Sequence, residues 1–330
     1  MLSLFYSEPD TDRWVPFDRY PRRVVSRIIR GKPRIGGHTR VFLNLCAGLD
    51  LLNMPYRVND YRYVKKHPDE IACIIGKPHI LNKIKWVNPI VFGAAVYSHP
   101  IDDPLLLRRL PVRKVLVPCE WMRKMCEPVW DDKVVVWPVG IDTETWAPVP
   151  EAVKDIDIIV YDKVRWEYER YERELIRPIV DSLNAEGLKF AVLRYGYYRE
   201  EDFSALLKRS RALLFLCEHE TQGIAYQQAL SCGVPILAWD RGGFWQDPSY
   251  YPDKVKFGTV SSVPYWDGRC GLKFENLSEY PDKLKKFLGK LHNGSFAPRD
   301  YILENLTLQK CAQQYVDIVD EVRKDIQPHA

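Results

Sequence analysis

The sequence predicts a doubly wound α/β protein with two domains. Short apolar runs rich in Val, Ile and Leu alternate with helical stretches along the 330-residue chain. Such runs are typical of parallel strands buried on both faces, and their alternation with helices builds a doubly wound sheet. The length fits two domains of roughly 150 residues each. The alternation pauses from Asp142 to Asp155, where Pro148 and Pro150 indicate a linker, so we expect domains at 1–148 and 149–330.

The expected strands share a run of four or more mainly apolar residues with few charges. In chain order they are Leu2–Ser7, Tyr56–Asn59, Ile71–Ile75, Ile90–Tyr97, Lys114–Pro118, Lys133–Trp137, Ile156–Tyr161, Lys189–Arg194, Ala212–Cys217 and Val234–Trp239. The expected helices are Val41–Leu52, Trp121–Val129, Glu167–Leu183, Phe203–Ser210, Gly223–Cys232 and Asp282–Leu291. A last helix, over about 307–325, is indicated by an apolar stripe and by Thr307 as its N-cap. We expect this helix to pack back on the first domain.

Composition excludes several classes of protein. A hydrophobic fraction of 46% with 28% charged residues excludes a disordered chain. The longest apolar stretch, Val41–Leu52, is too short for a membrane span of about 20 residues. The N-terminus lacks a basic segment and does not resemble a signal peptide, so we expect a cytoplasmic protein. The eight cysteines form no Cys-x-x-Cys pair or zinc-type cluster, which favours free thiols.

Positive charge is concentrated near the N-terminus. Residues 13–40 contain nine Lys or Arg residues and one acid, Asp18, a local charge of +8 against +4 for the whole chain. We expect Arg19–Arg40 to contact an anionic acceptor or the inner, anionic face of a membrane, which would place the protein peripherally there. A solvated face is the alternative. Nucleic acid is not favoured, because no nucleic-acid-binding motif accompanies the run.

The most informative segment is Cys217–Gly243, CEHETQGIAYQQALSCGVPILAWDRGG. Its pattern predicts a strand, a polar loop, a helix, a turn, a second strand and a Gly-rich loop. The loop Glu220-Thr221-Gln222-Gly223 stands where a parallel strand ends and a helix begins, and open α/β sheets bind ligands there. The first amides of that helix suit a phosphate. Glu220 and Gln228 are about two helical turns apart, so both can face one ligand.

This segment resembles the signature of the retaining, GT-B-fold glycosyltransferases of family 4. That signature is a Glu, seven residues, a second Glu, then Ala, two residues, Gly and Pro. Glu220 matches the first acid, and Ala229–Pro235 matches the end of the pattern. Further pieces occur in the family's order, and the resemblance spans most of the chain. They are Gly36-Gly37, His99, Val115–Trp121, Val136–Asp142 and Trp146–Pro148.

The resemblance implies two GT-B domains that face each other across a cleft. The first would lie on the acceptor side, and the second would bind a nucleotide diphosphate sugar, which is a substrate, so that no cofactor is needed. Glu220 and His99 would be the catalytic residues that orient the sugar. The donor would be bound by Gly36, Gly37, Lys163, Arg165, Thr221, Gln222, Gly223, Ile224 and Gln228. The reaction implied is transfer with retention to a glycan or lipid-linked acceptor.

Two positions depart from the family's pattern. Gln228 replaces the second Glu, which in the family binds the ribose hydroxyls, although an amide can also hydrogen-bond a diol. Lys163 occupies the position that is normally Arg, and the usual later Lys is missing, so Arg165 or Arg170 would substitute for it. These departures motivate one rival function, a catalytically silent nucleotide-sugar-binding module. A second rival keeps the fold but changes the reaction: a GT-B-type nucleotide-sugar epimerase.

A metal ion is not expected in the mechanism. Asp10-Thr11-Asp12 has the form that holds a divalent cation in metal-dependent GT-A enzymes, but no other GT-A feature follows it. We expect the basic groups at the donor site to take the place of a metal.

Overall fold

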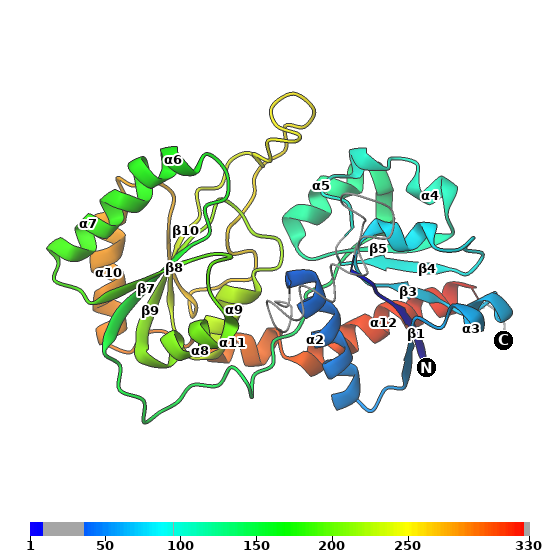
Figure 1. Cartoon of the computed structure of the whole chain (residues 1–330), viewed down its shortest axis with the longest axis horizontal. Helices are drawn as coiled ribbons and strands as arrows, with labels where there is room; N and C mark the ends of the chain where they lie inside the picture. Colours follow the sequence, from blue (N-terminus) through cyan, green and yellow to red (C-terminus); the bar gives the residue numbers. More distant parts are fainter. Residues whose placement is uncertain (9–35, 95, 327–330) are drawn as a thin grey trace, which may run out of the picture. The chain divides into compact units, whose positions relative to one another are not determined.

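A computed structural model of the chain describes residues 1–8, 36–94 and 96–326. It contains two α/β units (Figure 1). The first unit comprises Met1–Pro118, Arg123–Val139 and the chain from Cys311 onward. The second comprises Cys119–Met122 and Gly140–Lys310.

The first unit is built on a six-stranded parallel sheet of order β2-β1-β3-β4-β5-β6. Its strands are β1 Leu2–Phe5, β2 Tyr56–Val58, β3 Ala72–Ile74, β4 Ile90–Gly93, β5 Val112–Val117 and β6 Val134–Val136. Its α-helices are α2 Gly37–Leu51, α3 Tyr61–Lys66, α4 Leu106–Arg109, most of α5 Glu120–Trp130 and most of α12 Leu308–Ile326. Short 3-10 turns occur at Pro78–Asn82, Pro100–Asp102 and Asp131–Lys133.

The C-terminal helix α12 is held on the first unit by a buried tryptophan that directly follows β6. The Trp137 indole N–H donates to the carbonyl of Cys311 at 2.8 Å, and its ring meets the Tyr315 ring edge to face at 5.0 Å. The helix begins after Thr307, whose hydroxyl accepts a hydrogen bond from the Lys310 amide at 3.2 Å. The predicted N-cap is therefore confirmed.

The second unit is built on a five-stranded parallel sheet of order β11-β10-β9-β7-β8. Its strands are β7 Ile156–Asp162, β8 Phe190–Arg194, β9 Ser210–Leu216, β10 Ile236–Trp239 and β11 Gly271–Phe274. Its helices are α6 Tyr168–Tyr171, the π-helical turn Glu172–Ile176, α7 Arg177–Ala185, α8 Glu200–Arg209, α9 Ile224–Ser231, α10 Tyr280–His292 and α11 Pro298–Asn305. The predicted parallel α/β architecture is confirmed in both units.

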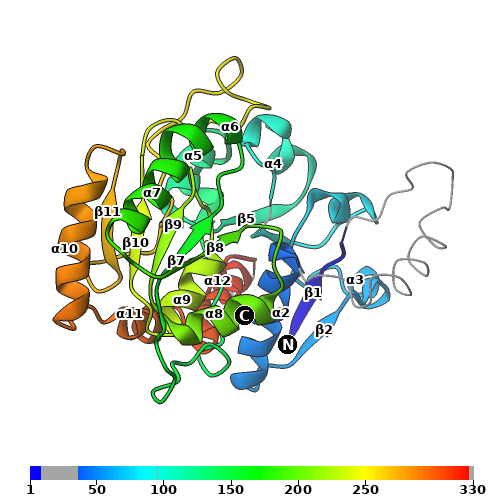
Figure 2. The same cartoon turned by 60° about the vertical axis from the view of Figure 1, so that its left-hand side comes forward.

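Both faces of the second sheet are covered by helices, as Figures 1 and 2 show. On one face, Ile179 of α7 and Leu284 of α10 belong to a buried cluster with strand residues such as Val160. On the other face, Tyr161 of β7 packs on Phe203 of α8, with ring centroids 5.5 Å apart. A sheet covered on both faces needs apolar residues at successive strand positions, which explains the continuous apolar runs in the sequence.

Three parts of the structure differ from the sequence-based expectation. Strand β11 was missed, because its four residues include Lys273. The short helices α3, α4 and α11 were also missed. The expected helix Glu167–Leu183 is interrupted by a π-helical turn just before Pro178. Proline has no amide hydrogen to donate to the preceding turn, so the regular α-helical hydrogen bonding is interrupted there.

The division between the units falls at Val139/Gly140, earlier than the boundary at 148 that the sequence suggested. The segment between these points packs inside the second unit. Trp146 is buried against Phe203, with ring centroids 6.0 Å apart, and its carbonyl accepts a hydrogen bond from the Ser231 hydroxyl at 2.7 Å.

Replacement of Gly271 by alanine is expected to lower the free energy of unfolding by more than about 2 kcal/mol. A Cβ at this position would lie 1.8 Å from the Ile236 carbonyl oxygen on β10, and φ is +147°. Chemical denaturation followed by circular dichroism measures the effect. Gly268→Ala is the matched control, because Gly268 is exposed and a Cβ there meets nothing within 4 Å. Equal stability of the two variants would contradict the prediction.

Candidate functional site

The site lies where the strand order of the second sheet reverses. The chain adds β8 on one side of β7 and then returns to add β9 on the other side. Open α/β sheets bind ligands outside the carboxyl ends of the strands at such a point. Lys163 directly follows β7, and Glu220 follows β9 within the next loop. Two residues singled out from the sequence are therefore brought together by the topology.

Lys163 and Glu220 form a largely buried ion pair between Nζ and Oε2, and their side chains are 13% and 11% exposed. Burial alone would raise the pKa of the Glu220 carboxyl, but the Lys163 charge outweighs it and the pKa is lowered. Burial alone would lower the pKa of Lys163, but Glu220 outweighs it and the pKa is raised. Both groups are therefore charged near neutral pH.

Further hydrogen bonds hold Glu220 in place. Its amide donates to the Ser261 carbonyl at 2.9 Å, and its Oε1 accepts from the Thr221 amide at 3.0 Å. Its carbonyl accepts from the indole N–H of Trp121 at 2.9 Å. Trp121 belongs to the segment Cys119–Met122 of the second unit. The carboxylate is thus presented on a fixed backbone.

Helix α9 begins directly after Gly223, which has a φ of +74°. A Cβ at this position would lie 1.9 Å from the Tyr226 ring, so only glycine fits. The Tyr226 hydroxyl accepts from the Tyr265 amide at 3.0 Å and lies 3.3 Å from the Tyr265 carbonyl, to which it donates. The first amides of α9, at Ile224 and beyond, give the site the positive end of a helix.

The glutamines of this segment are buried. The Gln222 side chain donates to Gln227 Oε1 at 3.3 Å, and Gln227 Nε2 donates back to the Gln222 carbonyl at 2.6 Å. Gln228 is 6% exposed within α9. Thr221 is half-buried next to Glu220. The loop and the helix start therefore form a rigid unit with the sequence-predicted residues on it.

Arg165 is held by two residues that the sequence reasoning missed, Glu218 and His219. Glu218 Oε1 accepts from the backbone amides of Arg165 and Trp166 at 2.7 and 2.8 Å. The Arg165 guanidinium lies 3.1 Å from both Nε2 and the carbonyl oxygen of His219. Their position directly after a buried strand, in the same loop as Glu220, was the available signal.

His219 is a neutral histidine inside an aromatic cage. Its ring centroid lies 5.0 Å from Trp166 and 5.6 Å from Trp121, and its Nε2 accepts from the Trp245 indole at 3.2 Å. Burial, with smaller contributions from Arg165 and other nearby cations, lowers the pKa of His219 to about 2. Because Nε2 accepts hydrogen bonds, the ring proton resides on Nδ1.

The loop after β10, the strand next to β9, also supports the site. Asp240 accepts from Lys273 Nζ at 2.8 Å and from the Ser262 amide at 2.7 Å, and Ser261 Oγ also donates to it at 3.1 Å. Ser261 in turn accepts the Glu220 amide. Arg241, the next residue, adds a positive charge that acts on His219.

The remaining predicted site residues, Gly36, Gly37 and His99, lie in the first unit. Helix α2 begins at Gly37, after Gly36 in extended conformation, and its first turn holds no acid. His99 follows β4 and caps the short turn Pro100–Asp102, with Nδ1 accepting from the Ile101 amide at 3.1 Å. Burial lowers the pKa of His99. Its Nε2 therefore carries the proton.

The first sheet also has a reversal point, between β1 and β3, and polar residues that the sequence reasoning missed lie there. Ser7, after β1, has its hydroxyl 2.9 Å from His79 Nε2 and accepts from Lys83 Nζ at 2.8 Å. Glu8 accepts hydrogen bonds from the hydroxyls of Tyr6 and Thr39. The carboxyl edge of the first sheet is therefore polar, like that of the second sheet.

Two sequence features lie outside the described residues. These are Asp10-Thr11-Asp12 and the basic run from Arg19 to Arg34; of the proposed contact surface Arg19–Arg40, residues 36–40 are described, and Arg40 is the one Lys or Arg among them. Among the described residues, no three His, Cys, Asp or Glu side chains are grouped to hold a metal ion. No helix in the described part of the chain is long and apolar enough to cross a membrane. All eight cysteines are free thiols, as predicted.

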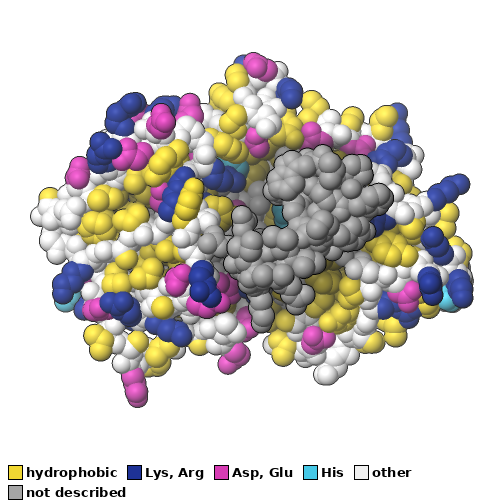
Figure 3. All heavy atoms as spheres, viewed as in Figure 1, with side chains coloured by type: hydrophobic (Ala, Val, Ile, Leu, Met, Phe, Trp, Pro, Cys, Tyr) yellow, Lys and Arg dark blue, Asp and Glu magenta, His cyan; other side chains and the backbone are white. Residues whose placement is uncertain are grey.

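The described surface carries mixed charge. On the face drawn in Figure 3, Lys and Arg side chains are interspersed with Asp and Glu.

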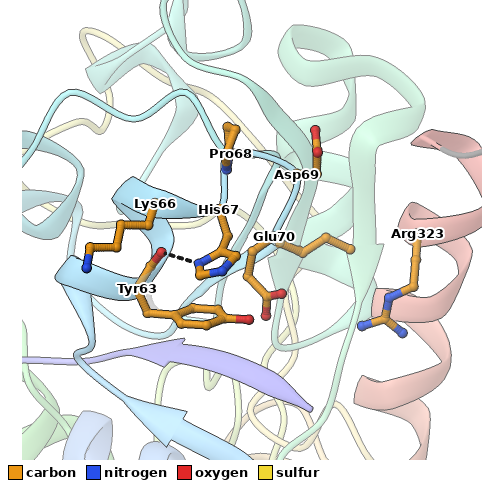
Figure 4. Close-up of a pocket in the computed structure, with 8 residues that line it drawn as sticks. Tyr63, Lys66, His67, Pro68, Asp69, Glu70 and Arg323 are labelled. Atoms are coloured by element: carbon orange, nitrogen blue, oxygen red, sulfur yellow. Dashed lines mark hydrogen bonds between the residues drawn. The ribbon is translucent and has the colours of Figure 1, made fainter.

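A hollow in the first unit is lined by residues of 63–71 and by Arg323 (Figure 4). There, His67 Nδ1 lies 2.8 Å from the Tyr63 carbonyl. This hollow precedes β3, at the amino ends of the strands, and is thus at the opposite edge from the one that binds ligands in such sheets.

Comparison with known sequences finds a partial match. No protein-family model matches the chain. The chain is 26% identical over 164 residues to a probable sucrose-phosphate synthase of Thermosipho melanesiensis, and the match covers 50% of this chain. It covers 34% of that curated relative, so the chain matches about a third of the relative's length.

Solved structures of low sequence identity share the fold. AviGT4, a glycosyltransferase involved in avilamycin A biosynthesis, is similar over 100% of this chain and 99% of its own, with a TM-score of 0.56 and 13% identity. A sucrose-phosphate synthase of Thermosynechococcus elongatus is similar over 79% of this chain and 75% of its own, with a TM-score of 0.51 and 12% identity. The predicted GT-B fold is confirmed, and the chain resembles GT-B glycosyltransferases of the family-4 type.

The buried His219 is expected to make the protein acid-sensitive. The unfolded chain takes up a proton on this ring near pH 6.5, whereas the folded chain does so only near pH 2. The free energy of unfolding therefore falls as the pH drops below 6.5, by up to about 1.4 kcal/mol per pH unit from this group. Replacement by Gln, which accepts hydrogen bonds and does not titrate, should reduce that slope.

Denaturation curves between about pH 6.5 and 5 measure the slope for wild type and His219→Gln. His292→Gln, at the exposed end of α10, controls for the loss of an imidazole. Identical slopes in wild type and His219→Gln would show that the His219 ring is protonated in the folded protein.

Proposed function

We propose that this chain is a retaining glycosyltransferase that moves a sugar from a nucleotide diphosphate sugar to a glycan or lipid-linked acceptor. The observation that carries the proposal is the buried Lys163–Glu220 pair at the strand reversal, beside the positive start of α9. The GT-B fold and the family-4 signature from Glu220 to Pro235 support the same reading. The donor would bind mainly to the second unit.

Charge on the leaving diphosphate is the main quantity that the site would stabilise. Lys163, Arg165 and the first amides of α9 supply positive charge and N–H donors at one edge of the sheet. Preorganised donors of this kind usually make the largest single contribution to such catalysis. We infer that these groups, rather than a metal ion, carry the developing charge.

Glu220 and His99 would orient the donor sugar. The Glu220 carboxylate is ionised and fixed by Lys163 and the Thr221 amide, so its remaining lone pairs can accept from sugar hydroxyls. The protonated Nε2 of His99 can donate to a sugar oxygen. Gln228 would hydrogen-bond the ribose diol in place of the Glu found in the family. Gly36-Gly37 would allow the donor to approach the start of α2 closely.

The acceptor is expected to be anionic or held at an anionic surface. The local charge of +8 in residues 13–40 motivates this part of the proposal. Such a charge attracts anions over about 8 Å at physiological ionic strength. Co-sedimentation with anionic vesicles at low and high salt tests it, with Arg22, Arg23 and Arg27 replaced by Glu as the comparison. If the wild-type protein does not bind the vesicles and the charge-reversed variant behaves in the same way, the basic run is only a solvated face.

The function is tested by a binding screen followed by product analysis. Thermal shifts with UDP, GDP, ADP and their sugars identify the donor, because a ligand at 100 times its dissociation constant adds about 2.7 kcal/mol of stability. NMR of the donor then reports hydrolysis and the anomeric configuration of the product. A retained configuration supports the proposal. Conversion of the sugar alone would indicate the epimerase, and binding without turnover would indicate the silent module.

Glu220→Gln is expected to reduce donor hydrolysis by about 100-fold or more, because the sugar loses its charged acceptor. The variant also leaves Lys163 without its counterion, which we expect to destabilise the protein. The double variant Lys163→Met, Glu220→Gln removes both charges and should recover stability without recovering activity. Asp155→Asn is the matched control, since it removes an exposed ion pair with Arg209 at the opposite edge of the sheet. Hydrolysis within twofold of wild type in Glu220→Gln would exclude the role.

Removal of Lys163 and Arg165 is expected to weaken diphosphate binding selectively. Each lost charge-assisted contact costs about 1.5–3 kcal/mol, so the double alanine variant should bind the nucleoside diphosphate at least about tenfold more weakly. Affinity for the nucleoside alone should be unchanged. Calorimetry measures both affinities. Arg170→Ala is the control, because Arg170 is engaged by Glu167 and Glu174 on the helix surface. An equal loss of affinity for both ligands would show that Lys163 and Arg165 stabilise the structure and do not bind the diphosphate.

A further inference from the structure

Glu218 and His219, which are not among the site residues expected from the sequence, connect the loops after β7 and β9. Glu218 and His219 both contact Arg165, and both are nearly inaccessible to solvent, at 2% and 4% exposure. Burying a carboxylate and an imidazole costs free energy unless each is well paired. Their placement therefore calls for a specific role.

Glu218 fixes the backbone of the loop that carries the cationic residues. A single oxygen, Oε1, accepts from the successive amides of Arg165 and Trp166 at 2.7 and 2.8 Å. Its other oxygen lies 3.8 Å from the Arg165 Nε. Successive amides that share one acceptor define the direction of the chain at that point. The Arg165 side chain therefore leaves the loop in a fixed direction.

His219 fixes the guanidinium itself. The Arg165 NH2 group lies 3.1 Å from both His219 Nε2 and the His219 carbonyl oxygen. The ring cannot turn away, because Trp245 donates to the same Nε2 and Trp121 and Trp166 pack against it. A planar guanidinium held on one side presents its remaining N–H groups in a defined plane.

We propose that Glu218 and His219 are positioning residues that hold Arg165 for the donor diphosphate. The inference rests on the proposed function, since it assigns the geometry of a residue in that site. The Arg165 side chain is 34% exposed, so one side of it contacts solvent while the other is bound. A long arginine that is already ordered loses less conformational entropy when it binds a phosphate.

The alternative is that His219 serves only to fill the aromatic cage. The two roles differ in what a phenylalanine would do. His219→Phe keeps a ring between the tryptophans but removes the acceptor for Arg165. His219→Gln removes the ring but keeps an acceptor. Positioning predicts that Gln preserves function better than Phe, whereas a purely structural role predicts the reverse.

Calorimetry with the nucleoside diphosphate that wild type binds tightest among UDP, GDP and ADP, and with the matching nucleoside, tests the proposal. His219→Phe should weaken diphosphate binding by about tenfold and leave nucleoside binding within twofold. His219→Gln should stay within about threefold of wild type for both ligands. The decisive measurement is a cycle with Arg165→Ala, in which the effect of His219→Phe should vanish.

The outcomes distinguish a failure of the positioning role from a failure of the proposed function. Equal diphosphate affinity in wild type and folded His219→Phe, or a loss that persists in the Arg165→Ala background, overturns the positioning role and leaves the proposed function standing. Failure of wild type to bind any of the three diphosphates overturns the proposed function and this inference with it. If His219→Phe does not fold, the same cycle with Glu218→Gln decides. That variant keeps an acceptor for both amides and removes the charge 3.8 Å from Arg165 Nε, so its loss of affinity should also require Arg165.

Discussion

The second unit depends on one register between two neighbouring strands. Asp162 at the end of β7 pairs with Leu216 at the end of β9, and the Lys163 amide donates to the Leu216 carbonyl at 2.8 Å. This register sets the two strand ends level, so that Lys163 meets Glu220 across the strand reversal. A slip of one residue would turn every side chain of a strand to the other face. Burial of the ion pair therefore requires the same register as the apolar core.

The charges at this edge of the second sheet balance to a small positive excess around His219. Lys163, Arg165 and Arg241 face two buried carboxylates, Glu218 and Glu220, while Asp240 is engaged by Lys273. The five groups around His219 thus carry one more positive than negative charge. A protonated His219 would add a further cation to this group. Its burial beside the arginines keeps it neutral, so it can accept a hydrogen bond from Arg165 instead of repelling it.

The sequence predicted the parts that depend on local pattern. Continuous apolar runs identified the central strands of both sheets, and the Glu220–Pro235 segment identified the loop and helix at the strand reversal. Strand β11 was missed because one of its four residues is Lys273. The helices α3, α4 and α11 are too short to show a helical repeat of apolar residues, and no sequence signature marks them as one marks α9. Glu218 and His219 were missed for a different reason. Their importance comes from hydrogen bonds to Arg165 and Trp245, residues distant in sequence that only the tertiary fold brings near.

Lys163 stands where the family-4 pattern that the chain resembles has an arginine, and its contacts differ from those of Arg165. A lysine ammonium is a compact point charge, whereas a guanidinium is a planar fork that matches a phosphate with two parallel hydrogen bonds. Lys163 is committed to the Glu220 carboxylate and also lies 4.5 Å above the Tyr195 ring. The planar fork is supplied two residues later by Arg165, in a loop that Glu218 holds by its backbone. In the proposed site, the compact charge of Lys163, which also fixes the Glu220 carboxylate, and the planar guanidinium of Arg165 would bind the diphosphate together.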